Sequence, residues 1–78
     1  MEGTVGTIML FAGDFAPQNW MFCDGQEMDI NNNAALYSII GVNYGGDGRT
    51  KFNLPKLTHE NSNLHYIICI AGLYPSRP

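Results

Sequence analysis

Residues 44–55 read Tyr-Gly-Gly-Asp-Gly-Arg-Thr-Lys-Phe-Asn-Leu-Pro and join a tight loop to a short apolar alternation. The three glycines lose too much backbone entropy in a helix or a strand, so they predict a constrained loop in which at least one has a positive φ. Phe52 and Leu54 alternate with a polar residue before a proline, the pattern of a brief edge strand. This stretch therefore predicts a tight return of the chain that brings two apolar side chains into the core.

The segment before this loop predicts one short helix over residues 32–40. Leu36, Ile39 and Ile40 recur at helical spacing. An asparagine at the start of the segment is able to cap the first turn, and Gly41 stands where a left-handed residue often follows a helix. We expect no second helix in the chain.

Three further apolar segments predict strands. Residues 6–12 are rich in β-branched and aromatic side chains, residues 20–23 end at an Asp-Gly turn, and residues 66–71 stop at a glycine. We expect the first and last of these strands to be neighbours in one sheet. The predicted fold class is α+β, a small mixed sheet with one short helix packed on it. The residues expected to supply most of its core are Leu10, Phe11, Trp20, Phe22, Leu36, Ile39, Ile40, Phe52, Leu54, Ile68 and Ile70.

The length of 78 residues limits the chain to one small core, because a domain of this size buries only about 60% of its unfolded surface. We therefore expect residues 1–78 to form a single domain. Charged residues make up 14% of the chain, against about 25% in an average domain, while glycine and asparagine are abundant. A small core beneath a weakly charged surface favours association with copies of itself.

Charge and hydropathy argue against nucleic acid and membrane insertion as partners. Four Lys and Arg against seven acids give a net charge of −3, too few cations for a phosphate-binding surface. The longest apolar runs, residues 8–12 and 67–71, fall far short of the ~20 residues that cross a bilayer. No positive charge precedes the first apolar stretch, so we expect no signal peptide and synthesis in the cytoplasm.

The two cysteines each sit in an apolar run. We interpret Cys23 and Cys69 as buried free thiols, with a disulfide between them as the alternative. Together with Asp24 and the histidines at 59 and 65, Cys23 supplies the residue types of a nucleophilic site. Apolar surroundings raise the pKa of a thiol and make it inert, so the sequence predicts no catalytic residues and no enzyme.

The sequence contains three candidate ligand sites: the glycine loop, Asp47 and the two histidines. The glycine loop lacks the Gly-Lys-Ser/Thr ending and the following helix of a P-loop, so it predicts no phosphate site. Asp47 is interpreted as a turn residue, with a contribution to a calcium site as the alternative. His59 and His65 are interpreted as solvated side chains, but across a three-fold axis one histidine per chain would supply three metal ligands. No cofactor is predicted.

Two motifs combine along the chain. A Pro-x-x-Trp…Cys-Asp-Gly stretch is followed by Tyr-Gly-Gly-Asp-Gly-x-Thr-x-Phe-x-Leu-Pro. Their residues are Pro17, Trp20, Cys23, Asp24, Gly25, Tyr44, Gly45, Gly46, Asp47, Gly48, Phe52, Leu54 and Pro55. Over residues 6–57, about two thirds of the chain, the sequence resembles the phage tail collar domain family, also described as microcystin-dependent-protein-like.

The resemblance implies a part of a trimeric tail fibre or related adhesin, made in the bacterial cytoplasm and carried in the tail of a phage or in a phage-derived injection particle. It implies a structural or attachment role, with other tail or fibre subunits as partners and no cofactor. Family members typically follow Leu-Pro with Asp-Leu-Arg-Gly-Arg, whereas residues 56–60 here read Lys-Leu-Thr-His-Glu. Longer members also insert a Gly/Ser-rich segment before the last strand, and its absence here favours a scaffold or tip-cap role over receptor contact.

Two functional hypotheses follow. The first is a structural or attachment component of a phage tail fibre or phage-like contractile injection apparatus, working as a homotrimer. Its predicted contacts between copies are Tyr44, Tyr74 and Arg77, since aromatic residues and arginine are enriched at interface cores. A monomer whose partners in the fibre are other domains is the alternative oligomeric state. The second hypothesis is a free-standing adhesion module for cell-surface glycans, with the aromatic contacts Trp20, Tyr37, Tyr44 and Tyr74.

Overall fold

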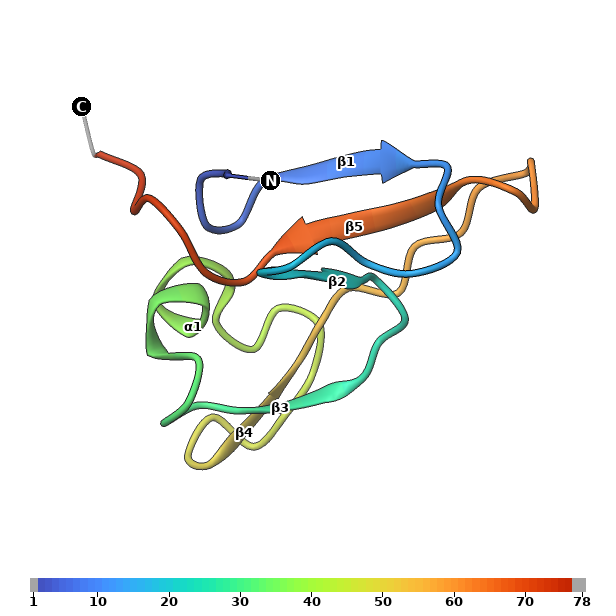
Figure 1. The fold of residues 1–78 in the computed structure, drawn as a ribbon. Helices are drawn as coiled ribbons and strands as arrows, with labels where there is room; N and C mark the ends of the chain where they lie inside the picture. Colours follow the sequence, from blue (N-terminus) through green and yellow to red (C-terminus); the bar gives the residue numbers. More distant parts are fainter. Residues whose placement is uncertain (1, 77–78) are drawn as a thin grey trace.

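The computed structural model describes residues 2–76, within which five strands and one helix build two antiparallel sheets (Figure 1). The elements are, in chain order, β1 (Ile8–Phe11), β2 (Trp20–Phe22), β3 (Glu27–Asp29), α1 (Ala34–Ile40), β4 (Lys51–Asn53) and β5 (His65–Cys69). Short strands with a single short helix confirm the α+β class. The predicted single mixed sheet is instead two antiparallel ones, because β3 leaves the turn at residues 24–25 and pairs only with β4.

The larger sheet has three strands in the order β1-β5-β2, so the last strand of the chain lies at its centre. Both neighbours run antiparallel to β5, with Ile8 opposite Ile68 and Trp20 opposite Cys69. The predicted adjacency of the first and last strands is confirmed. The strands nearest the two ends of the chain are thus direct neighbours, and the elements between them in the sequence lie on the other side of β5 from β1 (Figure 1).

The smaller sheet pairs β3 with β4, and Met28 lies opposite Phe52. The sequence predicts the strand around Phe52, and the structure confirms it. It does not predict β3, because that strand has only three residues, two of them acidic, and shows no apolar periodicity. Here the pairing with β4, not the local sequence, makes these residues extended.

The main core fills the space between the two sheets and α1. Its fully buried members are Val5, Cys23, Leu36, Phe52, Leu54 and Ile68. Because successive side chains of a strand point to opposite faces, the neighbouring residues of β5 enter a second, smaller cluster on the other face. That cluster consists of Trp20, Ile67 and Cys69, with Phe11 and Phe22 packed against it.

Two residues predicted for the core lie at the surface instead: Leu10 is 42% exposed and Ile39 is 36% exposed. Leu10 belongs to an edge strand, so one of its sides has no neighbouring strand. Ile39 lies beside Gly6, while α1 turns only Leu36 fully inward. Val5 and Ile67 are buried although the sequence analysis left them out of the core. The four predicted core residues found half-buried at the rims of the clusters are Phe11, Phe22, Ile40 and Ile70.

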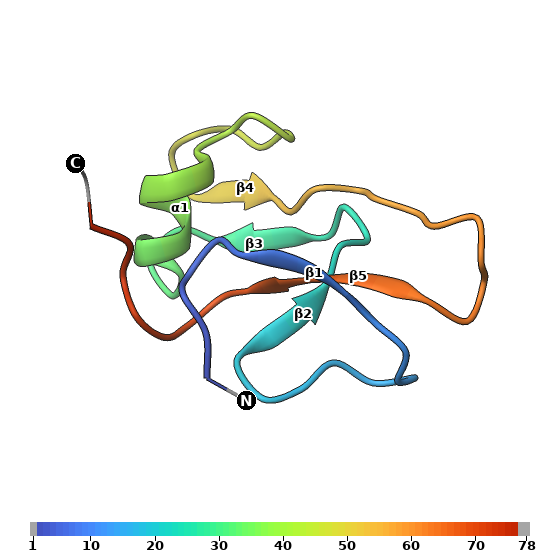
Figure 2. The ribbon, with the colours of Figure 1, turned by 90° about the horizontal axis from the view of Figure 1, so that it is seen from above.

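The helix α1 lies at one end of both sheets, next to the C-terminal segment (Figure 2). It begins after Asn33, whose side chain donates a hydrogen bond to the Asp29 carbonyl (3.0 Å) and makes no cap bond to the helix. It ends at Gly41, whose N–H donates to the Tyr37 carbonyl (2.8 Å). Its φ of 56° is positive, which favours glycine, but its ψ of −142° lies outside the left-handed helical conformation that the sequence predicts. No helix in residues 2–76 has the length and apolar character needed to cross a membrane.

Candidate functional site

The glycine loop is constrained as predicted. Gly45, Gly46 and Gly48 all have positive φ, at 124°, 111° and 73°. The tightest position is Gly46, where a Cβ would lie 2.4 Å from the Phe52 Cα and 2.5 Å from the Lys51 carbonyl oxygen. Only glycine allows the loop to approach the backbone of β4 this closely.

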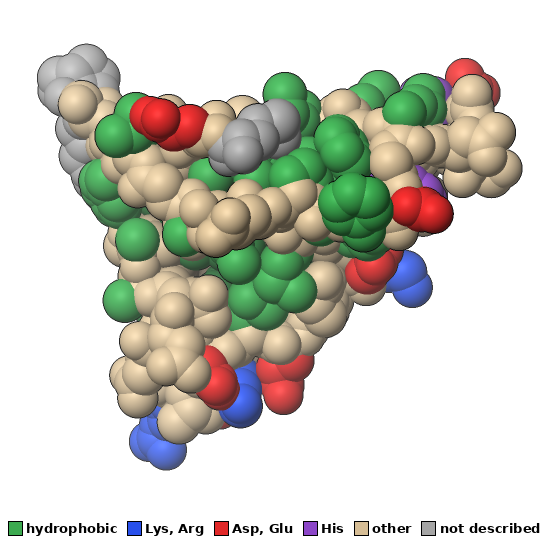
Figure 3. Space-filling model, in the orientation of Figure 1, with side chains coloured by type: hydrophobic (Ala, Val, Ile, Leu, Met, Phe, Trp, Pro, Cys, Tyr) green, Lys and Arg blue, Asp and Glu red, His purple; other side chains and the backbone are tan. Residues whose placement is uncertain are grey.

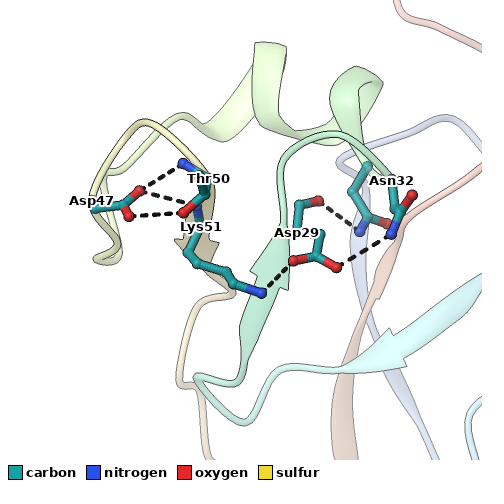
Figure 4. A network of polar contacts seen from close by, with 6 residues as sticks. Asp29, Asn32, Asp47, Thr50 and Lys51 are labelled. Atoms are coloured by element: carbon teal, nitrogen blue, oxygen red, sulfur yellow. Dashed lines mark hydrogen bonds and ion pairs between the residues drawn. The ribbon is translucent and has the colours of Figure 1, made fainter.

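Asp47 holds the rest of the loop through its carboxylate (Figure 4). One oxygen, Oδ1, accepts hydrogen bonds from the backbone N–H groups of Arg49 (2.8 Å), Thr50 (2.9 Å) and Lys51 (3.0 Å). The other oxygen accepts one from the Thr50 hydroxyl (2.9 Å). These donors lower the pKa of Asp47 below its usual value, since they favour the charged form. Both oxygens therefore serve the loop itself, which is the role of a turn residue.

The same loop covers the outer edge of β4. The Gly48 N–H donates to the Lys51 carbonyl (3.2 Å), and the Asn53 N–H donates to the Gly45 carbonyl (3.0 Å). With the Lys51 N–H bound to Asp47, the outward donors and acceptors of β4 are largely occupied. The motif thus protects a sheet edge, which is a structural task.

An ion pair ties the two strands of this sheet together. The Lys51 ammonium contacts the Asp29 carboxylate, which also accepts a hydrogen bond from the Asn32 amide (3.2 Å; Figure 4). The hydrogen bond and charge of Lys51 lower the pKa of Asp29, and Asp29 in turn raises the pKa of Lys51. Both side chains are well exposed, so solvent screens the pair.

The structure brings the two sequence motifs into contact. The Gly25 N–H donates to the Pro55 carbonyl (3.1 Å), and the Asn53 amide donates to the Gly25 carbonyl (2.9 Å). At the start of the first motif, the Trp20 N–H donates to the Pro17 carbonyl (3.0 Å). The motif residues therefore act as packing and turn positions of one framework.

The two cysteines are buried and free, which confirms the interpretation as unpaired thiols. Burial, with a smaller contribution from Asp24, raises the pKa of Cys23 to about 11. A thiol with this pKa is protonated at neutral pH and is a poor nucleophile. Cys69 donates through its sulfur to the Ala71 carbonyl (3.2 Å).

His59 and His65 lie together at a half-open hollow of about 260 Å³ beside the segment that connects β4 to β5. The lining of the hollow is Asp24, Leu57, Thr58, His59, Ser62, Leu64, His65 and Tyr66. The His59 Nδ1 accepts the Asn61 N–H (3.0 Å), and the His65 ring lies 4.9 Å from the Phe22 ring. Across residues 2–76, no group of three side chains is placed to bind a metal ion. A metal here therefore needs ligands from other copies.

The predicted contact residues have different surroundings. Tyr44 and Tyr74 are 51% and 52% exposed, and the Tyr74 hydroxyl is hydrogen-bonded to the Ser38 hydroxyl. Trp20 is only 5% exposed and is therefore unable to stack on a sugar. Tyr37 is half-buried, with its ring 5.4 Å from that of Phe52. Arg77 lies outside the described residues.

One feature that the sequence analysis missed is an exposed apolar strand. Ile8, Met9 and Leu10 of β1 are each between 38% and 42% exposed. An uninterrupted apolar run without alternation is the signal that both faces of this strand are apolar, but it does not distinguish a central strand from an edge. Only the sheet order shows that β1 is an edge.

Comparison with known proteins agrees with this framework. The sequence profile of the family described as Phage Tail Collar Domain matches residues 6–61. No curated protein matches the chain. The matched residues include four of the five strands, the helix, the glycine loop and the turn at residues 24–25. Collar domains are structural parts of phage tail fibres and associate with other tail or fibre components. Since the match spans well over half of its length, the chain belongs to the phage tail collar domain family.

Proposed function

We propose that the chain is a scaffold or tip-cap subunit of a phage tail fibre or of a phage-like contractile injection apparatus, without catalytic activity. The observation that carries this proposal is the family match over residues 6–61. The placement of the motif residues supports it. Gly46, Asp47 and Gly25 hold turns and cover strand edges, and none of them lines the hollow around His59 and His65.

The segment between β4 and β5 favours a scaffold or tip-cap role over direct binding to a receptor. The segment from β4 to β5, residues 54–64, projects from the sheets and turns back near residues 60–64 without the Gly/Ser-rich insertion of longer family members (Figures 1 and 2). The side chains of Asn61 and His59 hold this path by accepting backbone N–H groups (2.9 and 3.0 Å). In this proposal the protein is made in the bacterial cytoplasm and joins the tail through other fibre subunits.

The proposal includes a homotrimer. A core of nine buried hydrophobic residues among the described ones leaves little stability margin for an isolated chain. The two half-exposed tyrosines, Tyr44 and Tyr74, supply the type of side chain that interface cores favour. Arg77 is the third proposed contact. A metal bound by one histidine from each of three copies, His59 or His65, is an additional possibility only if this trimer forms.

Particle purification tests the structural role. Tail or injection particles from the producing strain are purified, and the chain is located with a specific antibody by electron microscopy. We expect the chain at the fibre or tail tip, in constant ratio to other tail subunits. Particles that lack the chain at every stage of assembly would contradict the proposal.

Sedimentation equilibrium of the purified chain tests the homotrimer. We expect a species of three times the chain mass at micromolar concentration, weakened by Tyr44→Ser combined with Tyr74→Ser. The matched control is Tyr66→Ser, because this half-buried tyrosine packs against the core and does not belong to the proposed contact. A monomer at all concentrations would support the alternative in which other fibre domains trimerise.

A free-standing glycan-binding module remains a second candidate. Tyr44 and Tyr74 favour it, since exposed aromatic rings are able to stack on sugar rings. The partly apolar hollow around His59 and Tyr66 is a second place for a sugar. A glycan array probed with the labelled chain in its native oligomeric state tests this candidate, and an array without binding contradicts it.

A further inference from the structure

The edges of the two sheets are protected very unequally. A strand at an edge offers unpaired N–H and C=O groups, and natural proteins cover such groups or place charges beside them. The described residues contain four edges, formed by β1 and β2 in the larger sheet and by β3 and β4 in the smaller one. The glycine loop covers the β4 edge, as described above.

The β2 and β3 edges are also protected. In β2, the Trp20 N–H donates to the Pro17 carbonyl, and the Phe22 carbonyl accepts the Gln26 amide (2.9 Å). In β3, the outward residues are the acidic Glu27 and Asp29, and the Asp29 carbonyl accepts a side-chain amide. Neither strand therefore offers a bare apolar edge.

The β1 edge differs from the other three. Hydrogen bonds alternate in an antiparallel pair, and the Cys69 N–H donates to the Thr7 carbonyl (2.9 Å). Continuing this alternation along the register turns the N–H and C=O of Met9 toward β5 and those of Ile8 and Leu10 away from it. No hydrogen bond within residues 2–76 reaches these outward groups of Ile8 and Leu10. Two donors and two acceptors thus lie open.

The side chains along this edge are apolar as well. Ile8, Met9 and Leu10 are 38–42% exposed, and residues 3–13 contain no charge and no proline. In Figure 3, hydrophobic side chains gather along β1 and β5, whereas the blue Lys and Arg side chains lie lower in the view, away from β1. An exposed apolar edge without charges is the type of strand that pairs with another chain.

We propose that β1 pairs antiparallel with β1 of a second copy of this chain, about a two-fold axis at Met9. In this register Ile8 of each copy faces Leu10 of the other, and the open groups of both form four hydrogen bonds. The result is one continuous six-stranded sheet in the order β2-β5-β1-β1-β5-β2.

Two observations favour a second copy as the occupant. In this register, the two open donors and two open acceptors of one β1 meet the acceptors and donors of the other. The whole chain has a net charge of −3, but β1 itself is uncharged, so two copies of β1 approach each other without like-charge repulsion between the strands. The other edges of the described chain are covered or charged, so β1 is the edge that a copy offers. At the β2 edge the Trp20 N–H and the Phe22 carbonyl are already bound to Pro17 and Gln26, so fewer groups remain there for a head-to-tail contact.

The size of the contact sets its strength. Four residues per copy bury far less than the about 800 Å² per partner of a standard interface. We therefore expect a reversible dimer that forms at high micromolar to millimolar concentration, and at lower concentration where a particle holds many copies close together. The two-fold contact is separate from the proposed three-fold association and would join copies of neighbouring assemblies.

The first test compares two leucine-to-lysine variants by sedimentation equilibrium over a wide concentration range. Leu10→Lys places a charge at the β1 edge and is expected to raise the dimer dissociation constant by about tenfold or more. Leu57→Lys is the matched control, since Leu57 is exposed to a similar extent, 38%, away from β1. It is expected to leave the constant unchanged. Thermal unfolding checks that both variants fold.

The outcomes distinguish the two-fold pairing of β1 from the proposed homotrimer. A wild-type chain that stays monomeric at millimolar concentration overturns the β1 pairing, as does an oligomer that Leu10→Lys and Leu57→Lys weaken equally. A trimer that Leu10→Lys does not affect, without dimers or hexamers at higher concentration, also overturns the pairing but leaves the three-fold association intact. Dimers that only Leu10→Lys weakens support the pairing whether or not trimers form.

The second test fixes the register by oxidation of introduced cysteines. Met9 faces its own copy across the axis at a non-hydrogen-bonded position, where Cβ atoms lie about 4.5–5.5 Å apart. Met9→Cys should therefore form an intermolecular disulfide quickly, while Leu10→Cys, which faces Ile8, should not. The native Cys23 and Cys69 are buried and do not compete. Equal cross-linking of both variants, or none, overturns this register.

Discussion

At the scale of single residues, Gly46 and Asp47 have complementary tasks. Gly46 allows the loop to touch the backbone of β4, and the Asp47 carboxylate then gathers the N–H groups that the turn leaves unpaired. Neither task involves a ligand. In the sequence, the glycine loop and Asp47 resemble parts of a phosphate or metal site. In the structure, their residue types are explained by the close backbone contact and by the backbone N–H groups that need acceptors.

The backbone approach at Gly46 predicts a large effect of a single methyl group. Gly46→Ala adds a Cβ that clashes with the Phe52 Cα at 2.4 Å, and it also strains a φ of 111°. We expect it to lower the free energy of unfolding by at least about 2 kcal/mol in urea titrations.

Gly48→Ala is the control for this effect, because it also changes a positive φ but meets no atom closer than 3.5 Å. Its expected cost is about 1 kcal/mol. Equal losses in the two variants would show that the backbone contact has no energetic consequence.

The lowered pKa of Asp47 predicts a dependence of stability on pH. A carboxyl group with a lowered folded-state pKa contributes stability above its unfolded pKa of about 3.9, and this contribution is lost as the pH falls through the folded value. Asp47→Ala should therefore destabilise the protein at neutral pH, and its difference from wild type should shrink below about pH 4.

Urea titrations of both proteins between pH 7 and pH 2 measure this difference. Asp47→Asn serves as the control, since it retains the oxygen that accepts three N–H groups but not the charge. We expect an intermediate loss at neutral pH. A difference between wild type and Asp47→Ala that stays constant down to the lowest pH would contradict the prediction.

The thiol of Cys23 supplies a chemical prediction. Its burial and its pKa of about 11 keep it protonated, so it should not react with a thiol reagent at neutral pH. Both cysteines should react fully in urea. Rapid labelling of Cys23 in the folded protein, detected by mass spectrometry of its peptide, would contradict the burial.

At the scale of elements, α1 contributes to the fold through one side of its surface. Leu36 is fully buried between the sheets, while Ile39, one turn later, is partly exposed beside Gly6. A seven-residue helix has little stability of its own, so its position depends on this anchor. The helix α1 therefore forms because Leu36 packs in the core, and the apolar periodicity of its sequence does not show which of its apolar residues are buried.

Two substitutions within α1 compare the contribution of its buried residue to stability with that of its partly exposed residue. Leu36→Ala should destabilise the protein by about 2–5 kcal/mol, because it leaves a cavity in the main core. Ile39→Ala, which gains somewhat more helix propensity than Leu36→Ala, should cost only about 1 kcal/mol. Thermal and urea unfolding measure both. Similar losses would mean that the helix is anchored through both residues.

At the scale of the whole molecule, apolar surface is distributed between a small core and an exposed edge. Both faces of the three-stranded sheet carry apolar clusters, yet β1 remains half open. An isolated chain with this distribution has little stability margin. In the proposed assemblies, copies of the chain or fibre subunits cover what the chain alone leaves exposed.

Association predicts that stability depends on concentration. Because an oligomer stabilises the folded chain by mass action, the unfolding midpoint of the wild-type protein should rise with chain concentration. The rise should be smaller in a chain that combines Leu10→Lys with Tyr44→Ser and Tyr74→Ser. Calorimetry at several concentrations measures it. A midpoint independent of concentration in the wild type would contradict self-association.

The sequence by itself determined the local features of this protein. The glycine loop, the helix ended by Gly41 and the strand pattern around Phe52 follow from backbone sterics and from side-chain periodicity, which act within a few residues. The family follows from the same motif residues.

Only the tertiary structure decided the rest. Burial and pairing depend on residues far away in the chain, so periodicity did not reveal that Leu10 and Ile39 lie at the surface or that Ile67 and Val5 are buried. The acidic strand β3 exists because β4 pairs with it, and β1 is open because β5 has β2 on its other side. An apolar run specifies a strand, but which of its edges meets solvent is set by the order in which distant strands assemble.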